Sequence, residues 1–114
     1  MTSVLEEAQQ IIHGARRADY GHPYDDFTRV GRIWAALLDI PEIPPEKVAL
    51  MLGGLKMARL CSNPGHRDSN LDWSGYSGTY ELVRERRTAK GNGHAAAVNP
   101  AIAVAAVTQP DGFA

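Results

Sequence analysis

The sequence has a single cysteine, Cys61, and almost no excess of charge of either sign. One cysteine excludes a disulfide within the chain and a cysteine-rich metal cluster. The 12 basic residues nearly balance the 13 acidic ones, so nothing predicts binding to duplex DNA or an anionic membrane, which needs a clustered positive excess. No run approaches the roughly 20 apolar residues that span a bilayer, and the first residues lack the pattern of a secretory signal. We therefore expect a cytoplasmic protein without a membrane partner.

Several catalytic motifs are missing as well. The sequence contains no glycine-rich phosphate loop of the Walker type and no pair of histidines spaced to bind a metal from one helix. It also lacks the Gly-x-Ser-x-Gly turn that carries the nucleophile of many hydrolases. These absences remove three common classes of enzyme.

What the sequence does have is a series of helical patterns that predicts an all-α fold. Ser3 and Glu6 form a capping box, and apolar residues at helical spacing then predict a first helix over residues 4–17. Similar patterns predict helices over 23–38, 45–60 and 68–87, separated by segments rich in glycine and proline. The 114 residues suffice for one domain. We expect a compact bundle of about four helices over residues 1–87, followed by a disordered tail over 88–114.

The predicted helix over 45–60 is apolar on nearly every side, which is typical of the central and most buried helix of a bundle. Its Gly53-Gly54 pair, and Gly75 and Gly78 in the next helix, suggest close approach by neighbouring backbones. From this we expect a homodimer or tetramer that packs through these two helices. Cys61 follows the same apolar run and is expected to be buried. The basic clusters at 16–17 and 84–87 are expected to be solvated helix ends, and both tryptophans are expected in the core.

Asp68 and Asp72 are four residues apart, so on a helix both carboxylates project from one face. Mg²⁺ takes one or two carboxylates together with waters and substrate phosphates, so it could occupy such a site. The alternative is purely structural: Asp68 caps the helix, while Asp72 pairs with Lys56 or Arg59 of the preceding helix. The spacing alone leaves both interpretations open.

Lys56 and Arg59 lie inside the most apolar predicted helix, on one face. Burying an unpaired cation costs several kcal/mol, so they must meet carboxylates, a phosphate or solvent. Together with Asp68 and Asp72 they suggest a phosphate and metal site.

The segment 19–23 is the second concentration of polar residues. Glycine, histidine and proline at the start of a helix can present backbone N–H groups to an anion. In this interpretation Tyr20 or Tyr24 stacks on a base, Gly21 admits the phosphate, and His22 bonds a phosphate or sugar. In the equally favoured alternative, the segment is a turn whose polar groups serve only the local backbone.

These residues resemble a small family, found mostly in phage and actinobacterial genomes, that is catalogued as a domain of unknown function. The resemblance spans residues 5–82. It rests on Tyr20-Gly21-His22-Pro23, on Lys56 with Ala58-Arg59-Leu60, and on His66-Arg67-Asp68-Ser69 followed by Asp72 and Gly75-Tyr76.

That family is in turn similar to the MazG-type all-α nucleoside triphosphate pyrophosphohydrolases, which use Mg²⁺ held by two pairs of acidic residues. The similarity implies that Asp68 and Asp72 match the second pair. The first pair has no match here, and Asp25 or Asp26 would have to replace it. Lys56 would then neutralise charge on the phosphate, and His22 or His66 would position the phosphate or the attacking water. Because the first acidic pair is missing, two alternatives to an enzyme stay open. One is a non-catalytic protein that sequesters a nucleotide or docks onto a host protein, and the other is a structural helical oligomer.

Overall fold

The computed structural model describes residues 2–91, and all the regular structure in that range is α-helical. Its elements are α1 (Val4–His13), α2 (Ala15–Tyr20), α3 (Pro23–Leu38), α4 (Pro45–Ser62) and α5 (Arg67–Ala89). The all-α class is therefore confirmed. Most of the expected tail, residues 92–114, lies outside the described residues. None of the helices described is both long and apolar enough to cross a bilayer.

The first helix begins where the sequence predicts but does not continue unbroken. The Ser3 hydroxyl accepts a hydrogen bond from the Glu6 N–H at 3.1 Å, and the Ser3 N–H donates to the Glu6 carboxylate at 3.3 Å, so the capping box is confirmed. The expected single helix over 4–17 is wrong, because Gly14 leaves the helical region and separates α1 from α2. The chain turns there and reaches Tyr20 before the helix ends.

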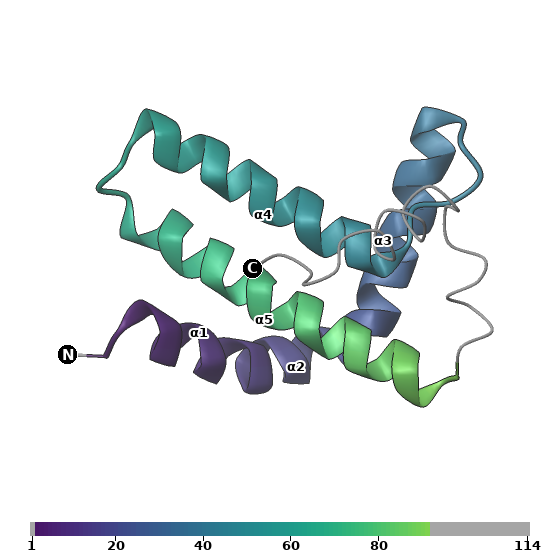
Figure 1. The fold of residues 1–114 in the computed structure, drawn as a ribbon, viewed down its shortest axis with the longest axis horizontal. Helices are drawn as coiled ribbons and strands as arrows, with labels where there is room; N and C mark the ends of the chain where they lie inside the picture. Colours follow the sequence, from purple (N-terminus) through teal and green to yellow (C-terminus); the bar gives the residue numbers. More distant parts are fainter. Residues whose placement is uncertain (1, 92–114) are drawn as a thin grey trace, which may run out of the picture.

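The central helix of the molecule is α5, which packs against α1, α3 and α4. Figure 1 shows α5 between α4 on one side and α1 with α2 on the other, while α3 crosses one end. The prediction that residues 45–60 form the most buried helix is wrong. Val48 and Ala49 of α4 are buried, but Leu50 and Met51 on its other side are 57% and 46% exposed. Helical periodicity shows which residues share one side of a helix. It does not show whether an apolar side is buried within the chain or exposed on its surface.

The main apolar core joins α3, α4 and the connector between them. It consists of five buried residues, namely Phe27, Ala35, Ile43, Val48 and Ala49. Gly31 of α3 is required here: a Cβ at this position would lie 2.0 Å from the carbonyl oxygen of Ile43. Removing apolar surface from water is the main driving force for folding, and this core holds the crossing helix α3 against α4.

The contact between α1 and α5 uses small residues. A Cβ added to Gly78 would lie 2.6 Å from Cδ1 of Ile12, and one added to Gly75 would lie 3.8 Å from Cγ2 of the same side chain. Close helix packing at Gly75 and Gly78 is therefore confirmed, but the neighbour is a side chain of α1 and not a backbone. Two other expectations are wrong: Cys61 is exposed, and Trp73 is 42% exposed rather than part of the core.

An ion pair fastens the start of α4 to the end of α5. The Arg87 guanidinium donates two hydrogen bonds to the Glu46 carboxylate, one of them 2.7 Å long, and both side chains are largely buried. Burial is the largest single influence on Glu46 and by itself would raise its pKa. The hydrogen bonds from Arg87 and the backbone, together with the positive charges of Arg87 and Arg84, outweigh burial and hold this pKa below its ordinary value. The hydrogen bond to Glu46 also raises the pKa of Arg87. Arg87 is therefore not the solvated helix end that we expected.

Candidate functional site

Arg16, on α2, is a cation surrounded by aromatic rings. Its guanidinium carbon lies 5.3 Å from the ring centre of Tyr20 and 5.9 Å from those of Phe27 and Tyr76. The side chain is half-buried, and none of the carboxylates in residues 2–91 forms an ion pair with it. Aromatic faces attract a cation, but they do not neutralise its charge. Arg16 is thus a positive group held in place and available to an anion.

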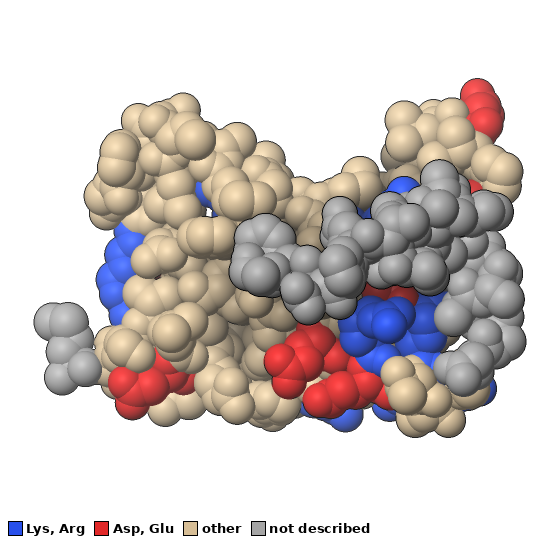
Figure 2. Space-filling model, viewed as in Figure 1, with Lys and Arg blue, Asp and Glu red and all other residues tan. Residues whose placement is uncertain are grey.

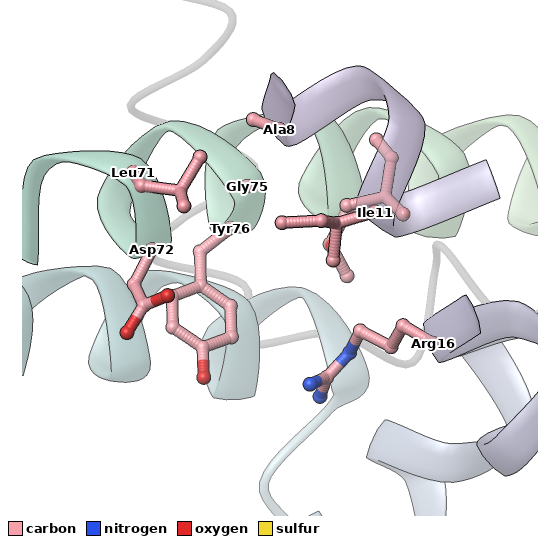
Figure 3. A pocket seen from close by; sticks show the side chains of 9 residues that line it. Ala8, Ile11, Arg16, Leu71, Asp72, Gly75 and Tyr76 are labelled. Atoms are coloured by element: carbon pink, nitrogen blue, oxygen red, sulfur yellow. The ribbon is translucent and has the colours of Figure 1, made fainter. Parts of the chain in front are cut away.

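A small cavity on one side of Arg16 lies between α1 and α5. Its lining includes Ile12, Asp72, Gly75, Tyr76 and Thr79 as well as Arg16. Figure 3 shows the Asp72 carboxylate and the Arg16 guanidinium on opposite sides of the Tyr76 ring. Polar groups of both signs thus meet around one aromatic side chain, a pattern that small-molecule sites often show.

A second small cavity lies on the other side of Arg16, toward the turn between α2 and α3. Its lining includes three predicted site residues, Tyr20, Gly21 and Asp26, together with Arg16 and Arg17. The structure thereby places the two polar concentrations of the sequence, the segment around Gly21 and the face of α5 with Asp72, on either side of one arginine.

Lys56 and Asp72 form an ion pair, with Nζ 2.9 Å from Oδ2. This is one of the two arrangements that the sequence left open. The Lys56 side chain is 14% exposed and that of Asp72 is 44% exposed, so the lysine is shielded and the carboxylate faces outward.

The described residues do not fit a preformed metal site. Among residues 2–91 no three histidine, cysteine, aspartate or glutamate side chains are grouped so as to hold a metal ion. Asp72 is already paired with a cation, Asp68 is exposed at the start of α5, and Asp26 lines the cavity on the far side of Arg16. A metal would need its other ligands from elsewhere, for example from the phosphates of a bound nucleotide. The set of Asp68, Asp72 and Asp26 stays a prediction.

Both candidate histidines cap helices. Nδ1 of His22 accepts a hydrogen bond from the Tyr24 N–H at 3.0 Å and so caps α3. Burial, and next the nearby Arg86 and Arg17, lower the pKa of His22, which favours the neutral ring that this bond requires. His66 caps α5 in the same way, with Nδ1 accepting from the Ser69 N–H at 3.3 Å. The cap of α5 is therefore His66, and not Asp68 as the structural alternative proposed.

Arg59 and His66 line a different, more open recess at the turn between α4 and α5, with Ser62, Asn63 and Ser69. Neither residue lines the two cavities beside Arg16. The predicted site is thus divided. Tyr20, Gly21, Asp26 and Asp72, with Lys56 behind Asp72, belong to the region of Arg16, whereas Arg59 and His66 belong to the other end of α5.

Arg16 itself was missed as a site residue, because two consecutive arginines suggested a solvated helix end. The sequence did hold a signal. In the helix that the sequence predicts over residues 4–17, Arg16 follows the apolar Ile12 by four residues, and that spacing would place both on the same face. A charged residue on the apolar face of a predicted helix is uncommon and therefore marks a candidate functional residue.

The first 91 residues also carry a recognisable family pattern. The model of a family described as a domain of unknown function, DUF6378, matches residues 3–84. The Gene 55 protein of Mycobacterium phage D29 is 40% identical over 83 residues, which cover 73% of this chain and 54% of the relative. The Gene 55 protein of Mycobacterium phage L5 is 38% identical over 92 residues, which cover 78% of this chain and 59% of the relative.

The chain therefore spans little more than half the length of these phage proteins. No solved structure matches it. With a family model that covers almost all of the described helices, and with two phage relatives, the chain belongs to the DUF6378 family.

Proposed function

We propose that this phage-type domain binds a nucleotide, with the nucleotide phosphate at Arg16 between the two small cavities. The observation that carries the proposal is the half-buried Arg16 guanidinium, which has no ion-pair partner among the described carboxylates. A guanidinium presents several N–H donors in a planar arrangement that matches phosphate oxygens. Bonds of this charge-assisted kind are stronger than those between neutral groups.

The surroundings of Arg16 supply the other groups that a nucleotide needs. The Arg16 guanidinium lies close to the rings of Tyr20 and Tyr76, and Tyr20 is 54% exposed, so part of its ring is available to a base. Gly21 lies at the edge of the second cavity, and its backbone has a φ of 75° that favours glycine. An added Cβ would meet nothing within 4 Å there. These features support a ligand with both a phosphate and a flat ring.

Mg²⁺-dependent hydrolysis is the finer prediction, and it rests on the resemblance to the MazG-type pyrophosphohydrolases. In its favour, Asp72 lines the cavity beside Arg16 and is partly exposed. Against a preformed metal site stands the lack of a grouped acidic set among residues 2–91. We therefore propose binding as the function, and we treat turnover as a question for the same experiment.

The test is calorimetric titration of the purified full chain with nucleoside mono-, di- and triphosphates, each with and without Mg²⁺, followed by analysis of the mixtures for product. We expect at least one nucleotide to bind. Arg16→Gln should weaken that binding roughly 10- to 100-fold, because a hydrogen bond to a charged group contributes about 1.5–3 kcal/mol. The matched control is Arg32→Gln, which removes an exposed cation from α3 and should leave the affinity unchanged.

The outcomes separate the candidate functions. Release of pyrophosphate or monophosphate only with Mg²⁺ would establish the hydrolase. Binding with unchanged nucleotide would establish the sequestering protein. Failure of the wild-type chain to bind any of the nucleotides, or equal effects of the two arginine variants, would refute the proposal.

A further inference from the structure

The side of α4 that faces away from α5 is apolar and carries no described partner. We call it the outer α4 face and define it as Leu50, Met51, Gly54, Ala58 and Cys61, which helical spacing places on one side. Four of these residues are exposed. In Figure 1, α4, α5 and α1 lie one above the other, with α4 on the outside. The surface of α4 that Figure 2 shows is almost entirely without charged residues. Of the cations of α4, Lys47 lies at the N-terminal end of this side and is half-buried, Lys56 pairs with Asp72 and Arg59 lines the recess of His66.

Gly54, in the middle of this face, has no role within the described chain. A Cβ added to it would meet nothing within 4 Å, whereas Cβ atoms added to Gly31, Gly53 and Gly78 would touch neighbouring residues. Glycine in a helix interior is unfavourable relative to alanine. A glycine that is not needed by its own chain is accounted for when another backbone crosses the helix at that point.

The sizes of the neighbouring residues fit a second copy of the same helix. In an antiparallel pair that crosses at Gly54, residues equally far before and after Gly54 face each other. Leu50 of one copy then meets Ala58 of the other, so a large side chain lies against a small one on both sides of a two-fold axis. A self-complementary face of this kind is what a symmetric dimer requires.

The projecting end of α3 enlarges the contact. In Figure 1 it rises beside the start of α4, and Figure 2 shows a hollow at the upper edge between this end and the rest of α4. Ile33, Leu37 and Leu38 on this end are 60%, 76% and 60% exposed. A second α4 lying antiparallel on the first would bring its C-terminal half to this hollow. A stable interface buries about 800 Å² on each partner, which is more than one helix face offers alone.

We propose that the chain forms a two-fold symmetric dimer in which the outer α4 faces cross at Gly54. The occupant is a second copy because the middle of the face is uncharged and sets Leu50 against Ala58 on both sides of its own centre at Gly54. Exposed apolar patches with these properties mark protein interfaces.

Two measurements test the dimer. In sedimentation velocity at about 50 μM, the full chain should have twice the mass of one chain. Leu50→Arg places a charge in the contact and should give a monomer with an unchanged helical circular dichroism spectrum. The control is Leu5→Arg, another exposed leucine, on α1, which should remain dimeric.

Cross-linking locates the axis. In a Cys61→Ser background, Leu50→Cys combined with Ala58→Cys sets each new thiol opposite one of the other copy and leaves Gly54, where the backbones cross, unchanged. A disulfide forms only when the two Cα atoms are within about 7 Å, so mild oxidation should join most of the chains into pairs. Leu5→Cys in the same background should stay unlinked. A monomeric wild-type chain would overturn the proposal, and so would a dimer that survives Leu50→Arg or fails to cross-link between positions 50 and 58.

Discussion

The replacement Arg87→Met tests how the ends of α4 and α5 are held together. In the structure the Arg87 and Glu46 side chains are only 7% and 12% exposed, and the guanidinium donates two hydrogen bonds to the carboxylate. Methionine keeps much of the length and apolar stem of arginine but removes the charge and the donors. Glu46 would then retain only Arg84, whose Nη1 lies 3.5 Å from Oε2 and whose side chain is 51% exposed.

The size of the effect follows from this burial. Removing one partner of a buried ion pair costs about 3–5 kcal/mol, because the other charge stays buried without compensation. Since Glu46 keeps a weak contact with Arg84, we expect the lower end, about 3 kcal/mol. A loss of 1 kcal/mol lowers the melting temperature of a domain of this size by roughly 4–8 °C, so the variant should melt more than about 10 °C below the wild type.

Urea denaturation followed by circular dichroism, at one protein concentration and near pH 7, measures the free energy of unfolding. Arg84→Met is the control and should lose less than about 1 kcal/mol, because it removes only an exposed and long ion pair. The double variant Glu46→Met with Arg87→Met should recover part of the loss, since it leaves no buried charge unpaired. A loss for Arg87→Met no larger than that for Arg84→Met would refute the reasoning.

The same pair makes a pH prediction. The pKa of Glu46 is lowered in the folded protein, so the unfolded chain takes up a proton first as the pH falls. The contribution of the pair is therefore present above the ordinary glutamate pKa of 4.5 and is lost as the pH falls through the lower folded value. The difference in stability between wild type and Arg87→Met should shrink in that range.

Three further changes test other parts of the structure by the same urea assay. Gly31→Ala places a Cβ 2.0 Å from the Ile43 carbonyl oxygen and should lower the free energy of unfolding by about 2–3 kcal/mol. A loss below about 0.5 kcal/mol, which is the usual range of neutral surface changes, would contradict the close approach. Gly78→Ala meets only the flexible end of Ile12 and should cost about 1 kcal/mol. His22 has a lowered pKa, so its capping of α3 stabilises the protein fully above pH 6.5 and is lost as the pH falls through the folded pKa. His22→Asn supplies a cap that does not titrate there, and its stability should fall less between pH 7 and pH 5; parallel pH curves for both proteins would count against the capping role.

Local patterns predicted the helices well, because helix starts are set by neighbouring residues. Ser3 with Glu6 forms the capping box that the spacing predicts. The break at Gly14 and the continuation to Tyr20 were missed, since a single glycine is tolerated in many helices. Which side of α4 is buried was also missed, because both sides are apolar.

The site was predicted only in its parts. The residue types at Tyr20, Gly21 and Asp72 predict polar sites in two segments that are far apart in the sequence. Only the structure shows that both segments lie beside Arg16. The contact between α1 or α2 and α5 joins residues about 60 positions apart, and no local pattern records it. The same limit hid the role of Arg87, whose partner Glu46 is 41 residues away in the sequence.

The central position of α5 has a consequence for how the chain is made. Helices α1, α3 and α4 all pack against the helix that is synthesised last among those described. Until residues 67–89 leave the ribosome, Ile12 lacks its neighbours Gly75 and Gly78, and the core between α3 and α4 lacks the cover of Tyr76 and Tyr80. The domain is therefore expected to reach its final packing only late in translation, as a unit. A ribosome stalled before α5 would carry at most the core between α3 and α4, with α1 still lacking the helix on which it packs.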